Sequence, residues 1–326
     1  MYFIEDFKEN EHIIEHFLCK QKQNLKTRSG KTYLSLRLQD RTGSIDAKVW
    51  ELNNDIQCFE ENEFIKVDGV VLTYQNDLQI KINRIRRSNE GEYDPENYIP
   101  RTDKNIDALY QEIAETVKTI TNPFIRRLMD DILICNEEIS SAFQICSAAK
   151  NMHHSYLGGL LEHTLSVTQI CDFLSGRYRH VNRDILISTA ILHDIAKVYE
   201  LSAFPENDYT DDGQLLGHLV MGAQIISEAA DKIEGFPHQL KSLLMHSILA
   251  HHGEYEYGSP KRPKTIEAFI LHCADNMDAK IKMFEESLSG GVTKGNWIGY
   301  QRILARNIRK SHFGAAAEKD RYAEKK

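Results

Sequence analysis

The sequence lacks the features that mark membrane, fibrous and disulfide-rich proteins. No uninterrupted apolar run in its 326 residues approaches the ~20 residues that a membrane-spanning helix needs. Its 7 prolines and 18 glycines form no repeat, which excludes collagen-like and mucin-like chains. Its 6 cysteines include no C-x-x-C pair, a pattern typical of reduced thiols in a cytosol. Residues 1–7 are acidic and lack the apolar stretch of a signal peptide, so we expect a cytoplasmic protein.

Charged residues are unevenly distributed along the chain. The net charge of −8 argues against a protein whose whole surface binds nucleic acid. Residues 20–48 nevertheless contain eight basic and two acidic residues, and residues 287–317 contain five basic residues and no acidic one. Local basic stretches of this kind steer a polyanion toward one face of a protein, although an ordinary solvated surface explains either stretch equally well.

At ~150 residues per domain, the length of the chain indicates two domains.

The first 88 residues show the alternation that is typical of β-strands. Residues 31–40 place three leucines on one face, and residues 45–49 continue the alternation after a turn signal at residues 40–43. Residues 64–72 and 78–85 provide two further strands. Short antiparallel strands in this number predict a small β-barrel at residues 1–88.

One face of the predicted barrel combines aromatic and basic side chains. Tyr33, Arg37, Lys48 and Trp50 are all expected to be exposed on it. Aromatic rings stack on bases and cations pair with phosphates, so this combination favours the binding of single-stranded nucleic acid. A single exposed ring is more often ordinary packing at the rim of a barrel.

The second part of the chain is predicted to be helical. Residues 89–102 are polar, contain prolines and a glycine, and form the predicted linker. A helical period of apolar residues begins after it and no strand pattern follows, so residues 103–314 are predicted to be all-α. The basic residues 294–310 are interpreted either as a terminal amphipathic helix with Ile298, Ile303 and Leu304 inward, or as a substrate contact through Trp297 and Tyr300. Residues 315–326, rich in alanine and charge, are predicted to be a disordered tail.

Histidine is the residue that the sequence concentrates. Of 14 histidines, eleven lie between His153 and His272. Imidazole and carboxylate groups recur in five apolar helical segments, where a polar group is costly unless it is hydrogen-bonded or binds a metal. Mixed nitrogen and oxygen donors suit Mn, Fe, Co, Ni or Zn and argue against a thiolate site. The predicted ligands are His163, His193, Asp194, His218, His251, His252 and Asp275.

The pair His193 and Asp194 offers two adjacent donors at a helix end. A carboxylate there can bridge two ions, and two ions ~3.5–4 Å apart clamp the attacking and leaving oxygens of a phosphoryl displacement. Lys197 follows on the same helical face as Asp194 and is placed to meet the phosphate oxygens. These residues predict phosphoester hydrolysis, with His193, Asp194 and Lys197 as the catalytic groups.

The ordered motifs resemble a known family. The H…HD…D order of His163, His193-Asp194 and Asp275 is similar to that of the HD-domain metal-dependent phosphohydrolases, and the further histidines resemble the members with two metals. Barrel, linker and helical domain, with HHSYLGGLLEHTLSV, ILHDIAK, HHG and ADNMDAKI, resemble the YhaM-type 3′→5′ exoribonucleases over nearly the whole chain. The resemblance implies an OB-fold barrel, an HD domain, and trimming of single-stranded RNA, or also of DNA, from the 3′ end by a metal-activated water.

The resemblance also implies how the ligands divide between two divalent ions. Manganese is the first expectation, with cobalt, iron, nickel and magnesium as alternatives. The first ion would take His163, His193, Asp194 and Asp275. The second would share Asp194 and take His218, His251 and His252.

Neighbouring polar residues have more than one interpretation. His153 and His154 lie close enough in sequence to His163 to line the mouth of the site. The sequence is equally compatible with a contact between His154 and the substrate and with a helix-capping or surface role. His246 and His272 are interpreted as supports of the ligands or as core residues. Glu162 is interpreted either as a hydrogen-bond acceptor behind the ligands or as an exposed residue.

Two rival functions use the same sequence features. HD ligands of this kind also serve nucleotide and cyclic-dinucleotide phosphohydrolases, in which the barrel would be a regulatory or binding module. A nucleic-acid-binding protein with a degenerate HD site is disfavoured because no expected ligand is replaced. The sequence leaves open the preference for RNA or DNA, which depends on 2′-hydroxyl contacts, and whether the chain forms homo-oligomers.

Overall fold

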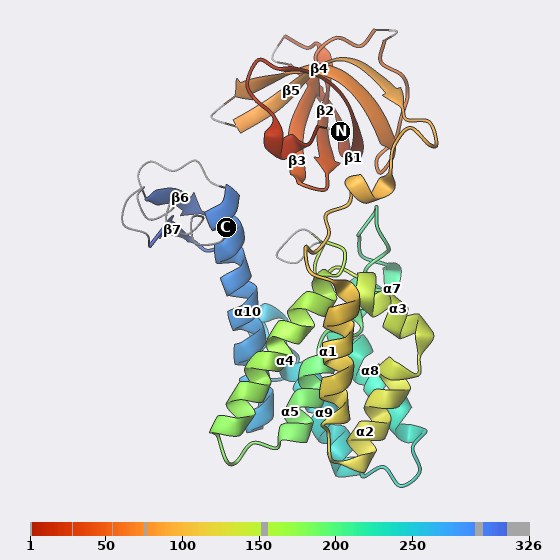
Figure 1. Cartoon of the computed structure of the whole chain (residues 1–326), viewed down its shortest axis with the longest axis vertical. Helices are drawn as coiled ribbons and strands as arrows, with labels where there is room; N and C mark the ends of the chain where they lie inside the picture. The colour runs from red at the N-terminus through yellow and green to blue at the C-terminus, as the bar shows by residue number, and fades with distance from the viewer. Residues whose placement is uncertain are drawn as a thin grey trace, which may run out of the picture.

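The structure, a computed structural model, describes residues 2–27, 29–53, 55–74, 77–150, 156–290 and 296–311. Figure 1 shows a β-barrel formed by the N-terminal part of the chain and a helical domain below it, joined by a connecting segment. A small β-hairpin extends from the upper end of the last helix (Figure 1).

Five strands close the barrel. They are β1 His12–Lys26, β2 Thr32–Asp40, β3 Gly43–Val49, β4 Phe64–Tyr74 and β5 Asp77–Arg87. Their order around the barrel is β1-β2-β3-β5-β4, with β3 and β5 parallel and the other pairs antiparallel. This order confirms the predicted small barrel and its OB fold.

The barrel core comes from the alternation that the sequence shows. The leucines at 34, 36 and 38 and the inward side chains Ile45, Ala47 and Val49 are all buried. Each fully buried aliphatic side chain contributes about 1.5–3 kcal/mol, so this inner face holds the strands together. The sequence did not predict β1, because a register shift between Cys19 and Gln21 interrupts its alternation and lets the strand bend from β4 to β2.

The connecting segment is attached to both domains. Tyr98 is buried against Phe64, with ring centroids 5.4 Å apart, and its carbonyl accepts a hydrogen bond from Gln39 Nε2 at 3.0 Å. At the other end, Thr102 N donates to the carbonyl oxygen of Leu157 at 3.0 Å. The polar composition that predicts a linker therefore belongs to a segment with fixed contacts along its length.

Apart from short 3₁₀ and π turns and the hairpin, the rest of the described fold consists of ten α-helices. Several begin at an asparagine whose side chain accepts a hydrogen bond from the first turn, which is a preferred helix cap. Within the residues that the structure describes, no helix is both long and apolar enough to span a membrane. The helices are α1 Ile106–Lys118, α2 Pro123–Met129, α3 Glu137–Ile145, α4 Gly159–Arg177, α5 Arg183–Leu192, α6 Lys197–Glu200, α7 Asp211–Leu215, α8 Gly217–Asp231, α9 His238–Ala250 and α10 Ile266–Gly290.

The segment after α10 corrects two predictions. It forms an antiparallel hairpin of β6 Trp297–Gln301 and β7 Arg306–Arg309, so the all-α description and the terminal amphipathic helix are both wrong there. Leu304 is buried as predicted, but Ile303 is 66% exposed. Gly299 has a φ of +101°, a left-handed conformation that glycine adopts readily and that interrupts a helix. The predicted tail at residues 315–326 lies outside the described residues.

Candidate metal centre and nucleic-acid interface

The predicted ligands meet where several helices begin or end. His163 lies near the start of α4 and His218 at the start of α8. The pairs His193-Asp194 and His251-His252 directly follow α5 and α9, and Asp275 lies within α10. All seven except His193 line one pocket of about 560 Å³, and His193 is fully buried beside it.

Asp194 lies between two groups of histidines. Its Oδ2 atom is 3.3 Å from His193 Nε2 and 3.8 Å from His163 Nε2. Its Oδ1 atom is 3.4 Å from His218 Nε2 and 3.7 Å from His251 Nε2. One buried carboxylate therefore presents each of its oxygens to a different group.

The first group is surrounded by carboxylates. His163 Nε2 is 3.2 Å from Asp275 Oδ1, and His163 Nδ1 is 2.7 Å from Asp278 Oδ2. Burial opposes protonation of this imidazole, but hydrogen bonds to Asp275 and Asp278 outweigh it and raise the pKa of His163 to about 9. A cation is therefore electrostatically favoured at this position.

The second group consists of His218, His251 and His252. His218 Nδ1 is 2.8 Å from Glu200 Oε1, and His218 Nε2 is 3.2 Å from His252 Nε2. Burial lowers the pKa of His251 well below its ordinary value, and burial together with the neighbouring His218 lowers the pKa of His252. These two imidazoles are therefore neutral rings, the form that binds metals.

The hydrogen bonds of the rings show that the donor set fits metal ions. Nδ1 of His193, His251 and His252 each contacts a backbone carbonyl, at 2.8, 2.7 and 3.0 Å, and must donate to it. In the neutral rings of His251 and His252, Nε2 then carries a lone pair that is available to a metal ion. Asp194 Oδ1 is buried and has no hydrogen-bond partner among the described residues, a costly state that a bound cation relieves.

Lys197 completes the inner part of the pocket. Its Nζ donates to Asp194 Oδ2 at 2.7 Å and to the carbonyl oxygen of Ala148 at 2.7 Å. Burial opposes its charge, but the Asp194 carboxylate prevails and raises the pKa of Lys197. The ammonium group is therefore charged, and its two acceptors among the described residues leave the third N–H for a ligand in the pocket.

The predicted nucleic-acid face lies on β2 and β3. Tyr33 and Trp50 are stacked, with centroids 4.7 Å apart, and Trp50 is 40% exposed. Lys48 Nζ donates to Ser35 Oγ, and Arg37 Nη1 lies 3.0 Å from Asp46 Oδ1. The four predicted side chains therefore share one outer face of the barrel, with Arg37 already paired to an acidic residue. His154, the fifth predicted contact, lies outside the described residues.

Two protein families match the chain, one over the helical domain and one over the barrel. Residues 160–280 match the family described as HD domain, and residues 20–87 match the family described as OB-fold nucleic acid binding domain. The chain carries an OB-fold domain followed by an HD domain. HD domains form a superfamily of metal-dependent phosphohydrolases that bind divalent metals, in agreement with the donor set of the pocket.

Several solved structures of OB folds are similar to part of the chain. The second OB-fold domain of replication protein A from Methanococcus maripaludis is 22% identical over 28% of this chain and 98% of that chain, with a TM-score of 0.23. An OB domain from Methanosarcina mazei is 21% identical over 27% of this chain and 84% of that chain, with a TM-score of 0.24. A chain of a replication protein A heterotrimer bound to single-stranded DNA is 15% identical over 27% of this chain and 65% of that chain, with a TM-score of 0.21. The strand order of the barrel itself, rather than these likenesses, establishes its fold.

Two carboxylates that were not predicted from the sequence contact the HD-domain histidines. Asp278 contacts His163 and accepts a hydrogen bond from the Ser166 hydroxyl, and Glu200 contacts both the backbone N and Nδ1 of His218. Asp278 follows Asp275 by one helical turn, a spacing that would have indicated it. Glu200 carries no comparable signal in the sequence.

The HHG motif is fixed by its neighbour His272. Gly253 has a φ of +81°, and a Cβ atom there would lie 2.2 Å from the His272 ring. His272 Nδ1 donates to the carbonyl oxygen of His251 at 2.8 Å. His272 thus contacts the backbone of the HHG turn, in agreement with its interpretation as a support of the ligands. His246 instead accepts a hydrogen bond from Lys264 N at 2.9 Å and does not line the pocket.

Glu162 contacts the connecting segment rather than the ligands. It accepts hydrogen bonds from the Thr102 hydroxyl at 2.6 Å and the Tyr156 hydroxyl at 2.9 Å. Its Oε1 is 3.1 Å from Lys104 Nζ, and the residue is buried. The interpretation of Glu162 as an exposed residue is therefore wrong.

The mouth of the HD pocket contains residues that sequence patterns did not single out. Lys150, Tyr209, Tyr257 and Lys280 all line the pocket, and Tyr209 and Tyr257 are 44% and 58% exposed. Aromatic rings and ammonium groups at the mouth suit a nucleotide, because rings stack on bases and cations attract phosphates.

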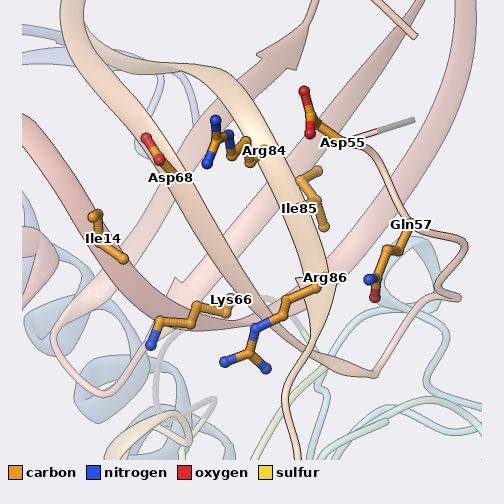
Figure 2. A pocket seen from close by; sticks show the side chains of 8 residues that line it. All are labelled: Ile14, Asp55, Gln57, Lys66, Asp68, Arg84, Ile85 and Arg86. Carbon is orange, nitrogen blue, oxygen red and sulfur yellow. The ribbon is translucent and has the colours of Figure 1, made fainter. Parts of the chain in front are cut away.

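A second hollow, of about 360 Å³, lies on the outside of the OB-fold barrel (Figure 2). Three basic and two acidic side chains of β4, β5 and the preceding loop surround it. Arg86 is bound by both oxygens of Glu92, at 2.7 and 2.9 Å, and Asp68 contacts His12 at 2.8 Å. Because its charges are mixed and partly paired within the protein, we assign this hollow no ligand.

Proposed function

We propose that the protein is a metal-dependent phosphodiesterase of the YhaM type, which removes nucleotides from the 3′ end of single-stranded RNA. The observation that carries the proposal is the position of Asp194, whose two oxygens face two separate groups of histidines beside one pocket. A carboxylate in this position is suited to bridge two cations, and two-cation sites serve the displacement of phosphoryl groups.

The distances between the ligand atoms divide the predicted ligands into two sets, one for each ion. His163, His193, Asp194 and Asp275 would hold one ion, and Asp194, His218, His251 and His252 the other. When bound, divalent ions such as manganese lower the pKa of a water molecule and neutralise charge on phosphoryl oxygens.

Lys197 is assigned the task of stabilising charge on the substrate. Its Asp194 contact fixes the ammonium group beside the ligands, and its third N–H can donate to a non-bridging phosphoryl oxygen. The hydrogen bond from Lys197 Nζ to the carbonyl oxygen of Ala148 holds the side chain in this orientation before substrate binds. Pre-positioned donors of this kind are effective because no reorganisation is needed during the reaction.

The placement of the ligands supports cleavage at a chain end. His193, Asp194 and His251 are each at most 2% exposed, so the reacting phosphate must enter the pocket to reach them. Lys150, Tyr209 and Tyr257 at the mouth would then contact the terminal nucleotide. We assign the binding of the remaining single strand to the OB-fold face that carries Tyr33, Trp50 and neighbouring cations.

A labelled RNA tests this proposal directly. Purified protein is incubated with single-stranded RNA labelled at its 5′ end, with manganese or with EDTA. Asp194→Asn is the test variant, and Asp212→Asn, an exposed carboxylate of α7, is the matched control. We expect a ladder that shortens from the 3′ end with manganese, and no products with EDTA or with Asp194→Asn.

Other products would assign a different function. Internal fragments would replace the exonuclease with an endonuclease. Intact RNA together with metal-dependent hydrolysis of mononucleotides or cyclic dinucleotides would overturn the proposal and make the barrel a regulatory module. Equal activity of Asp194→Asn and the wild type would remove the chemistry from this pocket.

A further inference from the structure

A loop of the HD domain forms part of the pocket mouth and also contacts the barrel. We call residues 201–210, which follow α6, the rim loop. Leu201 and Tyr209 of the rim loop line the pocket. Asp208 of the same loop holds Lys150 Nζ at 2.5 Å, which places this cation beside the Tyr209 ring, 6.0 Å from its centroid. The rim loop thus positions two of the groups at the mouth.

The inner side of the rim loop is bonded to the backbone that supports Lys197. The buried Asn207 side chain accepts a hydrogen bond from Ser147 Oγ at 2.5 Å. It donates to the carbonyl oxygens of Ala149 and Lys150, each at 3.2 Å. The intervening residue, Ala148, supplies the carbonyl that accepts from Lys197 Nζ. A displacement of the rim loop would therefore reach the acceptor that orients Lys197.

The outer side of the rim loop is bonded to the barrel through one lysine. Lys20 Nζ donates to the carbonyl oxygens of Pro205 at 2.6 Å and Glu206 at 3.0 Å, and to Asn62 Oδ1 of the barrel at 3.2 Å. These three acceptors use all three N–H groups of the ammonium. An ordinary surface lysine donates mainly to water, whereas each N–H of Lys20 has an acceptor within the protein.

The barrel strand is shaped to direct Lys20 outward at this point. Lys20 lies at the register shift of β1, between Cys19 and Gln21, which pair with neighbouring positions on β2. A bulge of this kind adds one unpaired residue and turns its side chain away from the regular alternation. Burial lowers the pKa of Lys20, although the carboxylates of Asp208 and Glu206 oppose this.

We propose that Lys20 is a positioning residue that docks the OB-fold barrel on the rim loop and so aligns the barrel with the pocket of the HD domain. This inference rests on the proposed function, since it concerns how a bound strand reaches that pocket. The connecting segment alone is one attachment, about which a domain can rotate. The Lys20 contact is a second attachment at a distance from the first, and it restricts that rotation. A strand held on the barrel would then enter the pocket past Tyr209 and Lys150.

The test compares Lys20→Ala with the matched control Lys26→Ala, which removes the same charge from an exposed position on the same strand. Activity is measured on RNA longer than the ~4–16 nucleotides that one OB fold covers, and on a dinucleotide that cannot span both domains. We expect kcat/KM of Lys20→Ala to fall about tenfold or more on the long RNA, since small misplacements of substrate cost large factors. On the dinucleotide it should stay within about twofold of the wild type, and Lys20→Arg should recover part of the loss.

Hydrogen exchange gives a readout that does not depend on activity. Backbone amides of residues 201–210 should exchange faster in Lys20→Ala than in the wild type or Lys26→Ala, while the barrel strands are unchanged. If the wild type degrades no RNA, this measurement still decides whether Lys20 holds the rim loop. Unchanged exchange, or an equal loss of activity on both substrates, would overturn the inference.

Discussion

Asp278 and Glu200 provide a selective test of the two-ion centre, because each contacts a histidine of a different group. Asp278 Oδ2 is 2.7 Å from His163 Nδ1, and Glu200 Oε1 is 2.8 Å from His218 Nδ1. A carboxylate behind a ligating imidazole fixes its orientation and raises the basicity of its other nitrogen. We therefore expect each carboxylate to affect one ion only.

The size of the effect follows from these contacts. A hydrogen bond to a charged group contributes about 1.5–3 kcal/mol, and about 1.4 kcal/mol corresponds to a tenfold change in affinity. Asp278→Asn keeps an acceptor but loses the charge, so the affinity of the ion at His163 should fall about tenfold. Asp278→Ala loses both and should weaken it nearer to 100-fold. Glu200→Gln should weaken only the ion at His218, by about tenfold.

Calorimetric titration of manganese into metal-free protein measures both binding events. Asp212→Asn serves as the control, because it removes an exposed carboxylate of the same domain. The expected pattern is the loss of one event with Asp278→Asn and of the other with Glu200→Gln. Equal weakening of both events by either variant, or no weakening, would refute the assignment of separate supports to the two ions.

Three further results are expected. Manganese at a hundredfold excess over its Kd should stabilise the chain by about 2.7 kcal/mol for each bound ion, seen as a rise in Tm that EDTA reverses and that Asp194→Asn lacks; an equal rise in that variant would point to ions elsewhere. Lys197→Met should lower kcat with little change in KM, because its third N–H acts on the phosphoryl oxygens; a change confined to KM would make it a binding residue. Tyr33→Ala or Trp50→Ala should weaken the binding of single-stranded RNA, measured by fluorescence anisotropy, by about 1–3 kcal/mol while the dinucleotide is still hydrolysed; unchanged binding would move the RNA to another face.

Sequence patterns predict the structure correctly where the signal lies within short segments. Leu34, Leu36 and Leu38 alternate because every second side chain of a strand points inward, and all three are buried. Such patterns mislead where a local irregularity interrupts them. The shift at Cys19 conceals β1, and the apolar spacing of Ile298, Ile303 and Leu304 is compatible with a helix as well as with the hairpin that forms.

The sequence by itself determined the order of the two domains and the chemical identity of the metal-binding groups, since strand and helix periods and side-chain chemistry are local properties. The tertiary structure decided how these groups relate in space. It placed the two oxygens of Asp194 toward different histidines and brought Glu200 to His218. It also joined Lys20 to Pro205, 185 positions along the chain. Contacts at such separations depend on how whole domains pack, and no repeating pattern in a single sequence encodes them.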